Sequence, residues 1–168
     1  MVDLFKPEEK KRGVNKVFVG GLIFALLAVG AVIAVLSLKP SMEVQTAKIL
    51  EGSLREGSPE FDALQKDIII STDDGTVQSP TGMGTISMYI NGKIRNKGTK
   101  TITALEVNVA VVTQFNAVLR ERRILVVPVQ QPSLGPGEII PITLTLDGFA
   151  KDDDRANIRW KVTAIKAK

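Results

Sequence analysis

An uncharged run of apolar residues at positions 17–38 constrains this chain more than any other feature. The run reads VFVGGLIFALLAVGAVIAVLSL and is flanked by Lys16 and Lys39. A helix of this length spans about 33 Å, which is enough to cross a hydrocarbon core of about 30 Å. A helix also satisfies its own backbone hydrogen bonds in lipid. We therefore predict one transmembrane helix over 17–38, with Pro40 ending it.

Two other interpretations of the run fit less well. A secretory signal peptide has a shorter apolar core, about 7 to 15 residues, followed by small residues at a cleavage site. The segment 37–41, SLKPS, is a poor site of that kind. A helix buried in a soluble core would show a polar stripe, whereas every face of this run is apolar. The sequence favours a membrane anchor.

Basic residues indicate the orientation of this anchor. Five precede it closely, and three follow it over a comparable distance (Lys6, Lys10, Lys11, Arg12 and Lys16 before; Lys39, Lys48 and Arg55 after). Basic flanks stay on the cytoplasmic side. We expect a cytoplasmic tail over 1–16, an anchor in the inner membrane, a linker over 39–66 and a periplasmic domain over 67–168. Anionic lipid headgroups are the expected partners of the tail.

Small residues within the run offer surfaces for another helix. Gly21, Ala25 and Ala28 fall on one face, and Gly30 with Ala34 forms a second pair four residues apart. Such residues let helix backbones approach closely in membranes, although they are also common in membrane helices that dock with nothing. These five residues are the helix-docking candidates.

The residue types that are missing exclude several chemistries. The chain has no cysteine and no histidine. It therefore has no disulfide, no thiolate metal site, no cysteine nucleophile and no imidazole base. The segment Gly82-Met83-Gly84 lacks the Lys-Ser/Thr of a phosphate loop. Few aromatic residues stand among the basic ones, so nucleic acid is not expected as a partner. We expect neither an enzyme nor a cofactor, nor any small-molecule substrate.

Two segments of the linker suggest secondary structure. Residues 44–50, VQTAKIL, suggest a first strand or an extended stalk. Ser58 then precedes Pro59, early acids and a late lysine, which are typical of a helix start and end. We predict a short helix near 58–66.

From residue 67 onward the sequence consists of short β-like runs separated by turn residues. Asp73-Asp74-Gly75 suggests a hairpin tip. The remaining runs alternate apolar and polar residues, with inward positions in four strands (Ile86, Met88, Ile90, Ile94; Leu105, Val107, Val109, Val111; Ile140, Ile142, Leu144, Leu146; Ile158, Trp160, Val162, Ala164). Pro128 marks an edge strand. The predicted fold is mainly β, an antiparallel β-sandwich.

The region from about 89 to 165 resembles the FxLYD-type domains and related bacterial immunoglobulin-like or fibronectin-like modules. The resemblance rests on GKIRN at 92–96 with Gly98, the valine-rich strand to Val112, the Phe115-Asn116 corner, and LGPGE at 134–138 before IPI. It implies an immunoglobulin-like sandwich outside the membrane that binds or scaffolds other molecules.

Two polar clusters complete the list of candidates. Arg120, Arg122 and Arg123 lie at the predicted hairpin connection 115–121 and its border, where they are either solvated or available to an acidic partner. Four acids near the last turn (Asp147, Asp152, Asp153 and Asp154) are either a solvated loop or oxygen ligands for calcium, at a spacing that matches no EF-hand.

Architecture and elimination together suggest a function. We expect a non-enzymatic, single-pass membrane protein whose periplasmic sandwich contacts other proteins, as an accessory or assembly subunit of a larger membrane complex. The alternative is an envelope sensor or binder of a lipid, glycan or peptide. An apolar cavity between the sheets would favour this alternative, and a filled core would favour the first hypothesis.

Overall fold

The computed structural model describes residues 16–37 and 42–168, which fall in two compact units divided after Val44. In the first unit, α1 (Lys16–Ser37) covers almost the whole predicted span. It is the one helix of the described residues that is long and apolar enough to cross a bilayer, and a signal sequence would meet the same criteria. The predicted tail, except Lys16, and Pro40 lie outside the described residues.

The linker is helical where a strand or stalk was predicted. Helix α2 (Met42–Ile49) continues into a turn in which the Leu50 amide donates to the Thr46 carbonyl at 2.9 Å. Residues 45–50 belong to the second unit. The helix is favoured because it turns Leu50 onto a small apolar cluster on the outer side of one sheet (Leu50, Ala104, Leu125 and Ala164).

The second predicted helix is confirmed as α3 (Pro59–Lys66). Ser58 is its N-cap, and the Ser58 Oγ accepts from the Phe61 amide at 3.2 Å. Proline follows at the first helical position, where its missing N–H costs nothing. Phe61 is fully buried, so this helix covers one end of the β domain.

Four strands form the first antiparallel sheet. They are β1 (Leu54–Arg55), β5 (Ile102–Val112), β6 (Val118–Val127) and β8 (Asn157–Ala167), in the order β1-β8-β5-β6. Pro128 follows directly after β6, which is an edge strand as predicted. We call this the β5 sheet.

The second sheet is built around β4 (Ile86–Asn96). One side of β4 pairs with β7 (Ile139–Phe149), and the other pairs with β2 (Ile68–Thr72) and β3 (Val77–Pro80). Because β2 and β3 occupy successive parts of the same side of β4, the predicted hairpin tip at 73–75 is wrong. Those residues join two strands that run in the same direction, and the hairpin forms instead between β3 and β4. We call this the β4 sheet.

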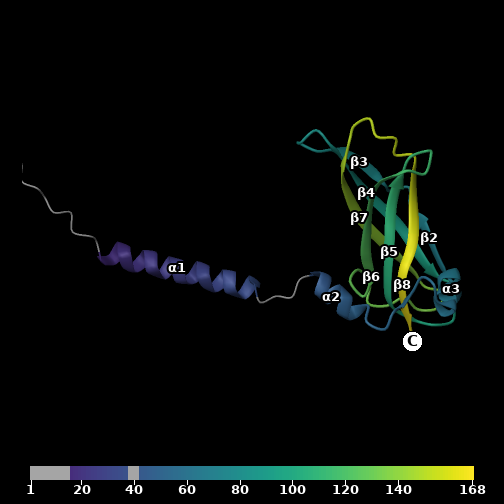
Figure 1. Cartoon of the computed structure of the whole chain (residues 1–168), viewed down its shortest axis with the longest axis horizontal. Coiled ribbons are helices and arrows are strands. Elements are labelled where there is room, and N and C mark those ends of the chain that lie inside the picture. The colour runs from purple at the N-terminus through teal and green to yellow at the C-terminus, as the bar shows by residue number, and fades with distance from the viewer. Residues whose placement is uncertain (1–15, 38–41) are drawn as a thin grey trace, which may run out of the picture. The chain divides into compact units, whose positions relative to one another are not determined.

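The inner faces of the two sheets share one apolar core, with α3 beside them (Figure 1). The predicted inward residues of β4, β5 and β7 are confirmed, since all but the half-buried Ile86 are buried in this core. Trp160 is half-buried at its margin, where Nε1 donates to the Thr72 Oγ1 at 2.8 Å. The chain is therefore mainly β, with two antiparallel sheets and few helices.

One predicted inward residue, Ala164, faces the other way. The pairing of β8 with β5 shifts between Val162 and Ala164, so Thr163 is an extra residue at a bulge. A bulge inverts the alternation beyond it. Ile165 consequently enters the main core, and Ala164 packs under Leu50 on the outer side of the β5 sheet.

Candidate functional site

The three candidate arginines lie within β6 itself, because this strand begins at Val118. Arg120 Nη2 donates to the Gly148 carbonyl at 2.7 Å, and Arg122 Nη1 donates to the Thr145 carbonyl at 3.3 Å. Both acceptors belong to β7 of the other sheet. Arg120 and Arg122 therefore join the two sheets, and Arg123, at the position opposite Asn108 in β5, has no side-chain hydrogen bond or ion pair among the described residues.

A third side chain completes this connection between the sheets. The Gln130 Nε2 donates to the Thr143 carbonyl at 2.9 Å, and the Thr143 amide donates to the Gln130 Oε1 at 3.1 Å. Among the described strands, β7 pairs only with β4, so these bonds satisfy backbone groups on its free edge. Unpaired edges invite association with other chains. The sequence gives no signal for this arrangement, because β6 and β7 are brought together only by the fold.

Two hairpin tips at one end of the β domain carry its most exposed large apolar side chains. Met83, in the β3–β4 turn, is 89% exposed, and Phe115, in the β5–β6 turn, is 83% exposed. Both turns lie at the end opposite α3 (Figure 1). Sequence reasoning singled out neither side chain as a contact residue.

The tip with Phe115 is held in place by several hydrogen bonds. The Thr113 Oγ1 accepts from the amides of Phe115 at 3.2 Å and Ala117 at 3.1 Å. Asn116 has a positive φ of 62°, a conformation that asparagine tolerates well. The Gln114 amide also donates to the Asp154 Oδ2 at 2.9 Å. Phe115 is thus an exposed aromatic side chain on a braced turn.

Three of the four candidate acids near this end accept hydrogen bonds from the β domain itself. Asp147 accepts a short hydrogen bond from Ser87, Asp153 accepts from the Ala150 amide at 2.7 Å, and Asp154 accepts from Gln114. Within 16–37 and 42–168, no group of three or more His, Cys, Asp or Glu side chains is placed to hold a metal ion. The structure therefore gives the calcium alternative no geometric support.

The helix-docking candidates remain unpartnered by the described chain. All five are exposed, and a Cβ built on Gly21 or Gly30 would have no neighbour within 4 Å. At about 100° per residue, the group of Gly21, Ala25 and Ala28 lies on the opposite side of α1 from Gly30 and Ala34. Two separate small-residue faces of α1 are therefore exposed.

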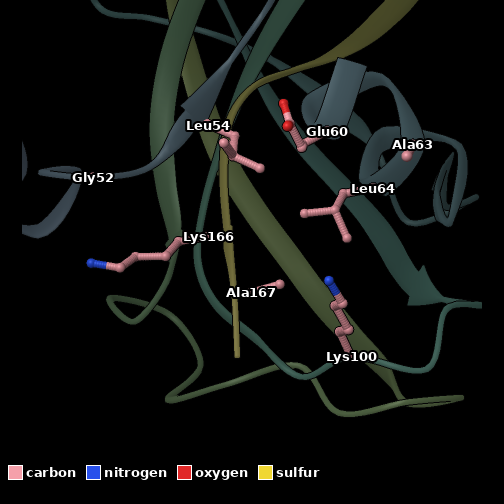
Figure 2. A pocket seen from close by; sticks show the side chains of 8 residues that line it. All are labelled: Gly52, Leu54, Glu60, Ala63, Leu64, Lys100, Lys166 and Ala167. Atoms are coloured by element: carbon pink, nitrogen blue, oxygen red, sulfur yellow. The ribbon is translucent and has the colours of Figure 1, made fainter. Parts of the chain in front are cut away.

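A pocket of about 360 Å³ opens at the α3 end of the β domain. Leu54, Ala63, Leu64 and Ala167 form its apolar part, and Glu60, Lys100 and Lys166 contribute charged side chains, with Gly52 at the margin (Figure 2). The Lys166 Nζ donates to the Glu51 carbonyl at 3.0 Å. Four separate segments of the chain meet here, and the sequence did not predict this pocket.

Comparisons with known proteins add little. No known family profile matches the sequence, and no curated protein is significantly similar to it. One similar solved structure is described as the putative ApaA protein from Bordetella pertussis, with 17% identity and a TM-score of 0.37, covering 60% of this chain and 91% of that one. Another is the structural-genomics target SoR45, with 12% identity and a TM-score of 0.40, covering 62% and 86%.

Proposed function

We propose that this chain is a non-enzymatic, single-pass protein of the inner membrane, with α1 as anchor and the β domain outside the cytoplasm as a contact module. Its partners are other proteins, and it acts as an accessory or assembly subunit of a larger membrane complex. The observation that carries the proposal is α1 itself, a helix whose apolar residues 17–34 are covered by none of the described chain.

The order of the strands supports an immunoglobulin-like assignment for the β domain. In such sandwiches the second and fifth strands pair in one sheet, and the third and sixth pair in the other. Counting β2 and β3 together as the first strand, β4 pairs with β7 and β5 pairs with β8 in that manner. Strand β1 takes the place beside β8 that a last strand would occupy.

Two features favour protein contacts over a ligand between the sheets. The inner faces of both sheets form one continuous cluster of buried apolar side chains, which supports the contact hypothesis over a ligand between the sheets. Exposed, braced aromatic side chains such as Phe115 are typical anchors of protein interfaces. The chain also lacks the histidine and cysteine side chains on which much enzyme chemistry depends.

The proposal is tested on the full chain, extracted from membranes in a mild detergent. The double substitution Gly21→Leu and Ala25→Leu fills one small-residue face of α1. We expect this variant to recover several-fold less of the co-purifying proteins than the unmodified chain. The matched control is Ala31→Leu, the same kind of change on a different side of α1. If the unmodified chain, the double variant and the control recover equal amounts of these proteins, docking through this face is contradicted. Release of the chain from membranes by an alkaline wash would contradict anchoring.

A further inference from the structure

The pocket at the α3 end combines an apolar interior with the ammonium group of Lys100, which pairs with no side chain of the described residues. Leu54 and Leu64 project toward its centre from β1 and α3, and the ammonium group of Lys100 points toward Leu64 and Ala167 (Figure 2). No hydrogen bond or ion pair to the Lys100 side chain occurs within the described residues. An ammonium group beside apolar side chains gains most from an anion that itself carries an apolar chain.

The other two charged residues of the pocket are less suited than Lys100 to bind an anion. The Lys166 ammonium already donates to the Glu51 carbonyl and points away from the pocket. Glu60 stands on the α3 wall, and no ion pair joins it to Lys100. The volume, about 360 Å³, lies within the range of small-molecule sites. It suits a charged headgroup with the first part of an acyl chain.

The length of the linker points to the source of such a molecule. Twelve residues separate Ser37, the last residue of α1, from Leu50, which is buried in the β domain. Eight of them form α2, about 12 Å long, and the others add at most about 18 Å. Leu50 lies close in sequence to Gly52 and Leu54 of the pocket. A membrane anchor therefore keeps this end of the domain within reach of lipid headgroups.

We propose that the pocket binds the phosphate and adjoining apolar chain of an anionic phospholipid from the bilayer in which α1 is anchored. This inference rests on the proposed membrane anchor. Lys100 pairs with the phosphate, and Leu54, Leu64 and Ala167 contact the methylene groups next to it.

The test uses the full chain in nanodiscs of phosphatidylcholine, with or without phosphatidylglycerol. The rate at which an amine-reactive reagent modifies Lys100 is measured by peptide mass spectrometry, with Lys151, in the β7–β8 connection at the other end of the domain, as internal control. We expect phosphatidylglycerol to slow modification of Lys100 about tenfold, the factor for one charge-assisted contact, and to leave Lys151 unchanged. Leu64→Gln should abolish that protection.

Three results would overturn the proposal. Equal slowing at Lys100 and Lys151 means general attraction to a charged surface. Protection that persists in Leu64→Gln means that the pocket is not involved. Protection by added dodecyl phosphate, but not by phosphatidylglycerol, shows the right chemical class from a free source and not from the bilayer. Flotation after an alkaline wash of the same sample tests separately whether α1 anchors the chain in the bilayer. If it does not, protection of Lys100 by dodecyl phosphate still tests whether the pocket binds an anion with an apolar chain.

Discussion

The side-chain amide of Gln130 pairs with both backbone groups of Thr143, with Nε2 2.9 Å from the carbonyl oxygen and Oε1 3.1 Å from the amide nitrogen. This is the pattern that a neighbouring strand would make. Gln130 follows β6, and Thr143 lies on the free edge of β7. The Gln130 side chain therefore satisfies backbone groups that a paired strand satisfies elsewhere in the sheets. With Arg120 and Arg122, it links β6 and the turn after it to β7 of the other sheet.

Replacing Gln130 with alanine should lower the free energy of unfolding by about 1–3 kcal/mol, since two hydrogen bonds of about 0.5–1.5 kcal/mol each are lost. It should also raise the tendency to associate, because the edge of β7 is freed. Chemical denaturation and analytical ultracentrifugation measure the two effects. Gln131→Ala is the control, because its side chain forms no hydrogen bond within the described residues. Equal stability of both variants would contradict the bridging role.

Gly92 should tolerate no side chain. A Cβ there would lie 2.8 Å from the Ser71 carbonyl oxygen and 3.0 Å from the Trp160 Cζ2, and the first of these is backbone that cannot turn aside. Gly92→Ala is expected to cost at least about 1–3 kcal/mol through overpacking, and to alter Trp160 fluorescence. Gly82→Ala, where a Cβ meets nothing within 4 Å, should leave stability and fluorescence unchanged.

Asn96 should be the most sensitive polar residue of the domain. The residue is 1% exposed, and its side chain donates to the carbonyls of Lys100 at 2.8 Å and Leu134 at 3.2 Å and accepts from the Gly98 amide at 2.9 Å. Asn96→Leu leaves the Lys100 carbonyl and the Gly98 amide without these partners, whereas the Leu134 carbonyl still accepts from the Ile102 amide. The substitution is expected to cost about 1–3 kcal/mol or more. The matched change at the more exposed Asn91 should cost clearly less in the same denaturation assay.

Alternation along the strands predicted the core-facing residues of β4, β5 and β7, because one face of each sheet meets the other sheet. It did not predict that β5 also buries Ala104, Glu106, Ala110 and Val112. It failed at two further places. The segment 44–50 is too short for its pattern to separate a helix from a strand, and packing of Leu50 against Ala164 decides for the helix. The bulge at Thr163 reverses which residues of the last strand face the core beyond it, and no residue type in the sequence indicates a bulge there.

The interaction surfaces were less predictable than the strands for a physical reason. Arg120 and Arg122 were identified by their charge, but their bonds to β7 depend on how β6 and β7 approach each other. The pocket likewise joins β1, α3, the β4–β5 turn and the end of β8, which are distant in sequence. Contacts between segments that are distant in sequence depend on the whole fold, so local sequence patterns do not predict them.

The ion pair between Asp73 and Lys93, at 2.8 Å, should make stability depend on pH in a defined direction. The hydrogen bond and charge of Lys93 lower the pKa of Asp73 below 3.8, and Asp73 raises the pKa of Lys93 above 10.5. Between its folded and unfolded pKa values, Asp73 therefore binds fewer protons in the folded state. Its contribution is present above pH 3.8 and is lost as the pH falls through the folded pKa.

This predicts that Asp73→Asn lowers the Tm slightly at pH 7 and that the difference from the unmodified protein shrinks toward pH 3. The contribution of Lys93 runs in the opposite direction. It is present below pH 10.5 and lost as the pH rises through the raised pKa. Because the pair is exposed, added salt should also reduce the difference. Asp152→Asn, at an exposed carboxylate outside any ion pair of the described chain, should show no such trend.

Phe115 should separate binding from stability. Its side chain is 83% exposed and contributes nothing to the core, so Phe115→Ala is expected to change the free energy of unfolding by no more than about 0.5 kcal/mol. If the braced turn presents it to a partner protein, truncation removes an aromatic anchor worth about 2 kcal/mol, or about thirtyfold in affinity. Recovery of the co-purifying proteins should fall accordingly, whereas Val129→Ala, at a residue 61% exposed after β6, should leave recovery intact. Unchanged recovery with Phe115→Ala would exclude this tip as the contact and direct attention to α1, whose two small-residue faces are separately testable.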